Sequence, residues 1–423
     1  MPDAATAIQQ RNLETAALVR QGRYDEALAL AGKTMQSAID TLGVDHPYTL
    51  VSINNLGYLH QVQGRLAEAE PLYIRAFEAR MRTLGADHPD TLLSVNNLAA
   101  LYREQSRFAE AEPLNLRALE ARERMLGPEH PDTLTSVNNL ALLYSAQGRF
   151  AEAESLYVRA LEARERTLGA EHPDTLNSVN NLAYLYQAQG RLAEAESHFL
   201  RALEARERTL GAEHPDTLLS LNNLAALYGA QGRLFEAEPL YLRAMAARER
   251  TLGADHPLTL SSVNNLATLY DWQGRAEAEM LYLRALEARE RTLGADHPDT
   301  LMSVNNLGYL YVLQGRLDEA EPLYLRALEA RERTLGAEHP NTLSSVNNLA
   351  YLYQRRGRFA EAEPLYRRAL ETSDRLRGTQ HPLTVVYAGN FTRSLLRGDA
   401  PAAAIRPARL LVQGLRRRQR ASE

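Results

Sequence analysis

The chain has 423 residues and a formal net charge of −5, with 48 basic and 53 acidic side chains. This mild acidity gives no general attraction for nucleic acid or for an anionic membrane surface. The chain has no cysteine, which excludes disulfides and thiol chemistry. Neither the N-terminal stretch MPDAATAIQQRNLE nor any later run is apolar enough for a signal core or a membrane span, so we expect a cytoplasmic protein.

A His-Pro pair recurs along almost the whole sequence at an interval of 42 residues, apart from one interval of 41 between His256 and His297. A fixed period in this range is typical of stacked repeats, in which each unit packs only against its neighbours. The pairs begin at His46, His88, His130, His172, His214, His256, His297, His339 and His381.

In chain order, residues 1–45 are predicted to form a degenerate N-terminal capping repeat and residues 46–380 eight tandem repeats. Residues 381–423 are predicted to form a degenerate C-terminal capping repeat with a basic tail. Terminal repeats are expected to be atypical because one of their faces has no neighbour. We interpret the run from Arg416 to Arg420 as a solvated tail, because one short basic run is weak evidence for nucleic-acid or lipid binding.

Each repeat is predicted to be a helical hairpin. In the copy that begins at His172, the first helix should run from Pro173, where a missing N–H is harmless, to about Gln189. The second helix should run from about Ala193 to Leu210 and end at a glycine. Apolar residues recur at helical spacing in both segments, so two apolar stripes should face each other.

The small and large residues of this copy follow a characteristic order: Leu182-Ala183, Tyr186, Gly190, Ala195, Phe199 and Ala202. That order resembles the tetratricopeptide repeat, whose usual unit is about 34 residues. The longer unit, with its NNLAxLYxxQGR and AEAEPLYxRALE segments, is similar to the kinesin light chain variety over about residues 46–380. The resemblance implies an all-α fold, a right-handed superhelical α-solenoid of helical hairpins. It does not imply motor attachment, because we expect no N-terminal heptad region here.

The nine histidines of the His-Pro pairs do not predict a metal site. Equivalent atoms in neighbouring repeats lie roughly a helix-packing distance of about 10 Å apart, whereas zinc ligands lie about 2 Å from the metal. We therefore interpret them as helix-start residues. No nucleophile elbow, phosphate loop or HExxH motif occurs, so we expect neither an enzyme nor a cofactor. Mixed-charge runs such as Leu203 to Arg208 are interpreted as a solvated outer face with i,i+4 pairs.

One face of the first helix points away from the hairpin core and carries Asn177, Asn181, Tyr184 and Ala188. In the family this helix lines the concave side, so the resemblance implies a groove. Asparagine is a poor helix former, yet it recurs at the position of Asn181 in every copy. A side-chain amide can hold the backbone of an extended peptide. The alternative is that these amides satisfy neighbouring helices.

The predicted peptide-binding residues join this amide row to aromatic, apolar and basic side chains of the later repeats. They are Asn97, Asn139, Asn181, Asn223, Asn265, Trp272, Met302, Asn306, Tyr309, Leu313, Asn348, Tyr351 and Arg355. Large apolar side chains dominate binding hot spots, and Arg355 follows them. The expected partner is therefore a protein or peptide, acidic and with an aromatic or apolar anchor. Trp272 could instead pack against the shortened turn at Arg275–Ala276.

Two other functions stay open at this point. The array could be a self-associating structural scaffold, which would make the protein a homo-oligomer. It could also be the sensor arm of a partner ATPase or signalling protein. Nucleic acid, membrane and metal are not expected as partners.

Overall fold

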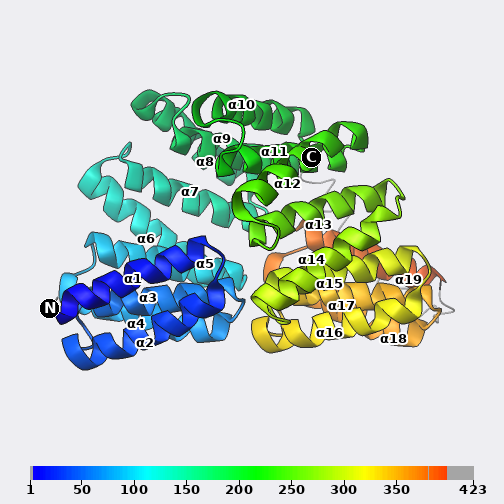
Figure 1. Cartoon of the computed structure of the whole chain (residues 1–423), viewed down its shortest axis with the longest axis horizontal. Helices are drawn as coiled ribbons and strands as arrows, with labels where there is room; N and C mark the ends of the chain where they lie inside the picture. The colour runs from blue at the N-terminus through cyan, green and yellow to red at the C-terminus, as the bar shows by residue number, and fades with distance from the viewer. Residues whose placement is uncertain (1–2, 380, 398–423) are drawn as a thin grey trace. The chain divides into compact units, whose positions relative to one another are not determined.

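The computed structural model describes residues 3–379 and 381–397, which form 19 α-helices and no strand (Figure 1). Eight odd-numbered helices, α1, α3 and α7 to α17, pack with the even-numbered helix that follows them in the chain, as in α9 with α10. The helices are α1 (Ala4–Arg20), α2 (Tyr24–Leu42), α3 (Pro47–Val62), α4 (Leu66–Leu84), α5 (Pro89–Glu104), α6 (Phe108–Leu126), α7 (Pro131–Ala146), α8 (Phe150–Leu168), α9 (Pro173–Ala188), α10 (Leu192–Leu210), α11 (Pro215–Ala230), α12 (Leu234–Leu252), α13 (Pro257–Trp272), α14 (Glu277–Leu293), α15 (Pro298–Leu313), α16 (Leu317–Leu335), α17 (Pro340–Arg355), α18 (Phe359–Arg377) and α19 (Pro382–Arg397). The predicted all-α array of hairpins is confirmed.

The histidine of each His-Pro pair begins a helix. At His172 the ring Nδ1 accepts a hydrogen bond from the backbone N–H of Asp174 at 3.2 Å, while Pro173 takes the first helical position. The other eight histidines accept the same bond at 3.1 to 3.2 Å. The helix-start interpretation is therefore confirmed, and each ring must keep its Nδ1 unprotonated to act as this cap.

The hairpin core follows the predicted stripes. Val179 and Ala183 of α9 and Ala195 and Phe199 of α10 are all fully buried. Alanines at the contact let the two helix backbones approach, while the aromatic ring fills the remaining space. At the turn between them, Gly190 has a φ of +78°, a conformation that favours glycine. These features explain the LAxLYxxxG and AxxxF spacing.

Arginines of the QGR motif join successive hairpins. The guanidinium of Arg191 lies over the Tyr186 ring, 4.0 Å from its centroid, and pairs at 2.8 Å with Glu154 of the preceding repeat. It also pairs with Glu194 in its own helix. Arg149, Arg233, Arg275, Arg316 and Arg358 stack on their tyrosines in the same way, at 3.7 to 4.2 Å. The motif is therefore a coupling element between repeats.

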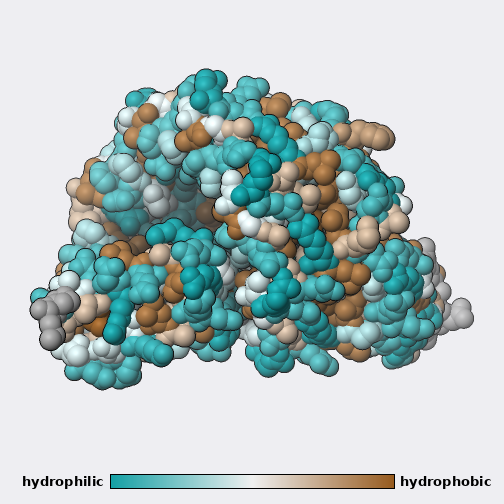
Figure 2. Space-filling view, in the orientation of Figure 1, coloured by the Kyte–Doolittle hydropathy of each residue, from teal (hydrophilic) through white to brown (hydrophobic). Residues whose placement is uncertain are grey.

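The mixed-charge runs also connect repeats, which differs from the predicted i,i+4 pairing. Arg201 pairs with Glu165 at 2.5 Å, 36 residues back, and Arg208 pairs with Glu171 in the same manner. An i,i+4 pair is present between Arg367 and Glu363. The prediction failed because helical spacing alone does not reveal the acid that the previous repeat places beside each arginine. Figure 2 shows a surface that is mostly hydrophilic, with smaller hydrophobic areas between.

The described helices fall into two compact units, α1–α14 and α15–α19. The repeat that lacks one residue keeps its hairpin: Arg275 is followed directly by Ala276, the N-cap of α14, which has 17 residues against 19 in α10. The capping roles predicted for the two ends of the chain stay predictions. The basic run from Arg416 to Arg420 lies outside the described residues.

Candidate functional site

The odd-numbered helices share an inner face within each unit. In the first unit α11 packs against α13, and in the second α15 packs against α17 and α17 against α19. We define the inner face by the residues five, nine, twelve and sixteen positions after each His-Pro histidine. On α9 these are Asn177, Asn181, Tyr184 and Ala188; all are exposed except Asn181, which is half-buried. The predicted side chains of this helix therefore share one accessible surface.

Four members of the predicted amide row are free. The side chains of Asn97, Asn139, Asn181 and Asn265 are half-buried and make no hydrogen bond to another described residue. Each amide therefore keeps two donors and an acceptor for another molecule or for water. All four lie in the first unit, on α5, α7, α9 and α13.

The other amides of the row are engaged. The hydroxyl of Tyr184 donates to Asn223 Oδ1 at 2.6 Å, and only 6% of Asn223 is exposed. Asn348 Nδ2 donates to Asn305 Oδ1 of the preceding repeat at 3.4 Å. Asn306 also has an interaction within the protein. At these positions the amide satisfies a neighbouring repeat, as the alternative interpretation expected.

The predicted anchor residues belong to both units. Trp272 is on α13 of the first unit and is 50% exposed. Its indole packs on Gly229 of α11. In the second unit, Met302, Tyr309 and Leu313 of α15 are exposed, Tyr351 of α17 is half-buried, and Arg355 is exposed and donates to the Tyr351 hydroxyl at 3.3 Å.

A row of buried arginines was not predicted from the sequence. Arg164 of α8 is 6% exposed, and its Nη1 donates to Ser178 Oγ at 2.7 Å and to the backbone carbonyl of Asp174 at 3.2 Å. No carboxylate of the described residues forms an ion pair with it. The equivalent arginines are all at most 8% exposed: Arg80, Arg122, Arg206, Arg248, Arg289 and Arg331.

These guanidinium groups face the inner surface from below. Arg206 Nη2 donates at 2.7 Å to Oδ1 of Asn177, an exposed inner-face residue. In Arg80, Arg164 and Arg248, Nη2 makes no hydrogen bond within the described residues. The Nη2 groups of these three arginines can therefore donate hydrogen bonds to a ligand that reaches the base of the inner face.

Burial without an ion-paired carboxylate lowers the pKa of six of these arginines: Arg80, Arg122, Arg164, Arg206, Arg248 and Arg331. Desolvation is the main cause for Arg164, and the nearby Asp174 opposes it in part. The most affected is Arg331, whose pKa burial lowers to about 10. All of them thus stay protonated at pH 7, and each retains a positive charge. A sequence signal existed: a serine recurs 14 residues after each of these arginines, on an otherwise apolar stripe.

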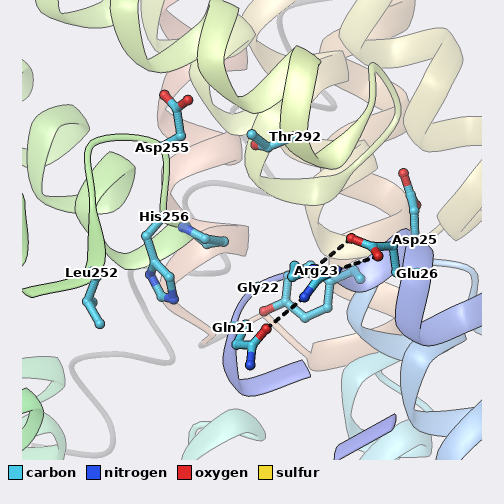
Figure 3. Close-up of a pocket in the computed structure, with 11 residues that line it drawn as sticks. Gln21, Gly22, Arg23, Asp25, Glu26, Leu252, Asp255, His256 and Thr292 are labelled. Atoms are coloured by element: carbon cyan, nitrogen blue, oxygen red, sulfur yellow. Dashed lines mark hydrogen bonds and ion pairs between the residues drawn. The ribbon is translucent and has the colours of Figure 1, made fainter. Parts of the chain in front are cut away.

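A separate cavity of about 390 Å³ lies in the first unit, between the α1–α2 turn and the α12–α13 loop (Figure 3). Its charged lining groups are already paired: Arg23 with Glu26 at 2.6 Å, and Asp255 with Arg291 at 2.8 Å. The turn is closely packed there, since a Cβ on Gly22 would lie 2.6 Å from Pro257 Cδ. This cavity therefore offers fewer free polar groups than the inner face.

Within residues 3–379 and 381–397, no helix is long and apolar enough to cross a membrane. The same residues contain no group of three or more histidine and acidic side chains that could hold a metal ion.

Comparison with known proteins identifies the repeats. Models described as tetratricopeptide repeat match residues 15–48, 51–258 and 263–410. A crystal structure of nearly identical repeats from a kinesin light chain-like protein of Podosopora anserina is 34% identical, with 48% of this chain and 98% of that chain covered and a TM-score of 0.42. A search of curated proteins found no match.

Two further solved structures are similar over different lengths. BtubC (BKLC) from P. vanneervenii is 24% identical, with 55% of this chain and 92% of that chain covered and a TM-score of 0.44. A Rap protein complexed with Competence and Sporulation Factor is 16% identical, with 93% and 98% covered and a TM-score of 0.46. The extent of the repeat matches decides the family: this chain belongs to the tetratricopeptide repeat proteins.

Proposed function

We propose that the inner face binds an extended, acidic peptide or flexible segment of a partner protein. Tetratricopeptide repeats mediate protein–protein interaction and are generally not enzymes. The proposal adds the surface and the chemistry of the ligand. It rests on one observation: the first unit combines free amides on its odd-numbered helices with buried guanidinium groups, free of carboxylate partners, that its even-numbered helices place against them.

The amides suit the ligand backbone. An extended peptide exposes N–H and C=O groups that an asparagine can pair with regardless of the peptide's sequence. Asn139 and Asn181 occupy the same register on successive inner helices, about 10 Å apart, which is close to the span of three extended residues. A strand of ligand that crosses these helices would meet them at regular intervals.

The arginines suit the ligand side chains. A carboxylate that reached Arg164 or Arg248 would find an already desolvated guanidinium with unused donors. The desolvation cost of the arginine has already been met during folding, so a charge-assisted hydrogen bond there is stronger than one on the outer face. A basic peptide would meet like charge, which favours acidic ligands.

Fluorescence anisotropy with labelled random peptides tests the proposal. One library fixes two Asp residues and a matched library fixes two Lys. The wild type should bind the Asp library more tightly. The triple variant Asn139→Ala, Asn181→Ala, Asn265→Ala should lose at least about tenfold in affinity, which corresponds to about 1.4 kcal/mol. Asn348→Ala is the matched control, because that amide is already bonded to Asn305.

Two results would contradict the proposal: no preference of the wild type for the Asp library, or equal binding by the triple variant. Light scattering on the same samples covers the alternative of a self-associating scaffold. A mass that rises with concentration, combined with no peptide binding, would favour that alternative. A constant monomer mass would eliminate it.

A further inference from the structure

We infer that Trp272 and Gly229 form the seat for an apolar side chain of this peptide and so set part of its specificity. The inference rests on the proposed function and adds a position, a residue pair and a spacing. Both residues lie in the first unit, on the neighbouring helices α13 and α11. They lie at the same end of these helices.

The indole of Trp272 rests on the backbone of Gly229. A Cβ built on Gly229 would lie 2.5 Å from the indole Cζ3 and 3.3 Å from Cε3, so only glycine leaves room for the ring in this place. Gly229 is buried, whereas half of Trp272 is exposed. Glycine is a poorer helix former than alanine, yet α11 has a glycine at the position that the indole contacts. One part of the ring is thus held by the protein and the rest faces outward.

The inner-face side chains that precede the indole at its register are small. The residues at the register of Trp272 in the two preceding copies are Ala188 and Ala230, and both are exposed. Small side chains followed by a large aromatic one make a step on the inner face. A flat or branched apolar side chain can lie in this step against the indole and bury apolar area on both sides.

A buried arginine of α12, which bonds to α13, indicates where the ligand's acid lies. Arg248, 5% exposed, donates to Ser262 Oγ at 2.8 Å and to the Leu258 carbonyl at 3.0 Å, and its Nη2 is unused within the described residues. Ser262 and Trp272 are ten residues apart on α13, which is about 15 Å along the helix axis. An extended segment covers that length in about four to five residues.

The inferred ligand therefore carries an acidic side chain and an apolar side chain about four to five residues apart. The two halves of the seat act on different parts of it. Arg248 binds the acidic side chain of the ligand, and the Trp272–Gly229 pair contacts the apolar side chain. Losing one should leave the other contact in place, which makes the inference separable from the proposed function.

The chain supplies its own reporter, because Trp272 is its only tryptophan. We would titrate two tryptophan-free peptides that each carry two Asp residues, one with a Phe four residues from the acids and one with Ala in its place. Intrinsic emission is recorded for the wild type and Gly229→Ala, and the anisotropy of a fluorescent label on the peptide is recorded for these two proteins and for Trp272→Ala, after circular dichroism shows equal helicity. Gly32→Ala is the matched control, since a Cβ there meets nothing within 4 Å.

The wild type should bind the Phe peptide about tenfold more tightly than the Ala peptide, with a shift of its emission maximum. Gly229→Ala should shift the emission of the free protein, because the indole must move, and should remove the preference for Phe. Trp272→Ala should also remove it, and it serves as the test if Gly229→Ala lowers helicity. Gly32→Ala should behave like the wild type.

The outcomes separate the two levels of the proposal. Equal affinity of the wild type for the Phe and Ala peptides overturns the seat while the acidic-peptide function stands. A preference for Phe that survives in both Gly229→Ala and Trp272→Ala also overturns it. No binding of either peptide counts against the seat and, with a negative Asp library, against the proposed function itself.

Discussion

Arg164 and Arg166 are two residues apart on α8, and their surroundings differ in every respect. Arg164 lies under the inner face, 6% exposed, and bonds a serine hydroxyl and a backbone carbonyl. The side chain of Arg166 is 59% exposed on the outer face and pairs with Glu129 of the preceding repeat at 2.6 Å. The outer arginine has a carboxylate partner and the inner one does not.

This difference shows how each repeat distributes its arginines and their acidic partners between the outer and the inner face. On the outer face the preceding repeat supplies an acid for Arg166 and for each arginine equivalent to it, so charge there is neutralised pair by pair and screened by solvent. Under the inner face, the guanidinium groups are buried and hydrogen-bonded to neutral partners, and a nearby aspartate such as Asp174 compensates their charge only in part. A ligand that approaches the inner face therefore meets a more positive surface than the net charge of −5 suggests.

The largest effect in this comparison is expected for Arg164→Ala. The change removes the donor from Ser178 Oγ and from the Asp174 carbonyl, and it leaves both acceptors in a closed site. Leaving buried groups without a partner should lower the free energy of unfolding by about 3 kcal/mol. Urea denaturation measures the loss, and hydrogen exchange should locate it at α8 and α9, because repeats interact only with neighbours.

Arg164→Lys is the control for charge. An ammonium keeps the positive charge but not the fixed geometry of the guanidinium, so an intermediate loss is expected. Full stability of Arg164→Ala would mean that the cost of burying the charge equals the value of its hydrogen bonds, and the inner row would then be held by packing alone.

The second effect concerns pH and compares a buried N-cap with an exposed one. His339 is 6% exposed, and burial, with the nearby Arg377 and Arg331, lowers its pKa to about 4. The folded protein therefore resists protonation that the unfolded chain accepts near pH 6.5. The contribution of this neutral ring is complete above pH 6.5 and is lost as the pH falls toward 4, amounting to about 2 kcal/mol between pH 7 and pH 5.

His339→Asn measures this contribution, because asparagine caps a helix without titrating in this range. The variant should lose less unfolding free energy than the wild type between pH 7 and pH 5. His172→Asn is the matched control, since that ring is 40% exposed. Equal pH dependence of the wild type and His339→Asn would show that the buried ring does not carry the acid sensitivity.

A smaller effect is expected for Arg149→Ala, which lies between the two extremes of burial. Its guanidinium stacks 3.8 Å from the Tyr144 centroid and pairs with Glu112 of the preceding repeat at 2.9 Å. About one third of the side chain is exposed, so solvent screening limits the ion pairs and the loss should be about 1 kcal/mol. Thermal unfolding measures it. Arg149→Lys should restore less than half, because lysine neither stacks as well nor pairs in two places.

Most of the hairpin architecture could be predicted from the sequence. The 42-residue period located every helix pair, and the observed bounds of α9 and α10, Pro173–Ala188 and Leu192–Leu210, lie within a residue of those predicted. The His-Pro cap was also predicted correctly. These features depend on contacts within one repeat, and local spacing is sufficient to specify them.

The candidate site was harder to predict because it depends on what the neighbouring repeat contributes. Asn181 and Asn223 are equivalent in sequence, but only Asn223 is covered, by the hydroxyl of Tyr184 one repeat earlier. The copy before Asn181 has Leu142 in that place, which offers no hydroxyl. Likewise Arg206 looks like part of a solvated run until Ser220 of the next repeat is seen to accept from it at 2.8 Å.

The smallest effect is expected for Arg166→Ala, and it decides what the outer ladder is for. The pair with Glu129 is fully solvated, so the energy of the ion pair is offset by the entropy of holding two long side chains together. Urea denaturation at low and at high salt should give the same midpoint for Arg166→Ala as for the wild type. A loss comparable to that of Arg149→Ala, and abolished by salt, would mean that the outer pairs stabilise the stack electrostatically. Unchanged stability would leave the ladder a different role: it neutralises the outer arginines equivalent to Arg166, while the guanidinium groups under the inner face keep a positive charge that an acidic ligand can reach.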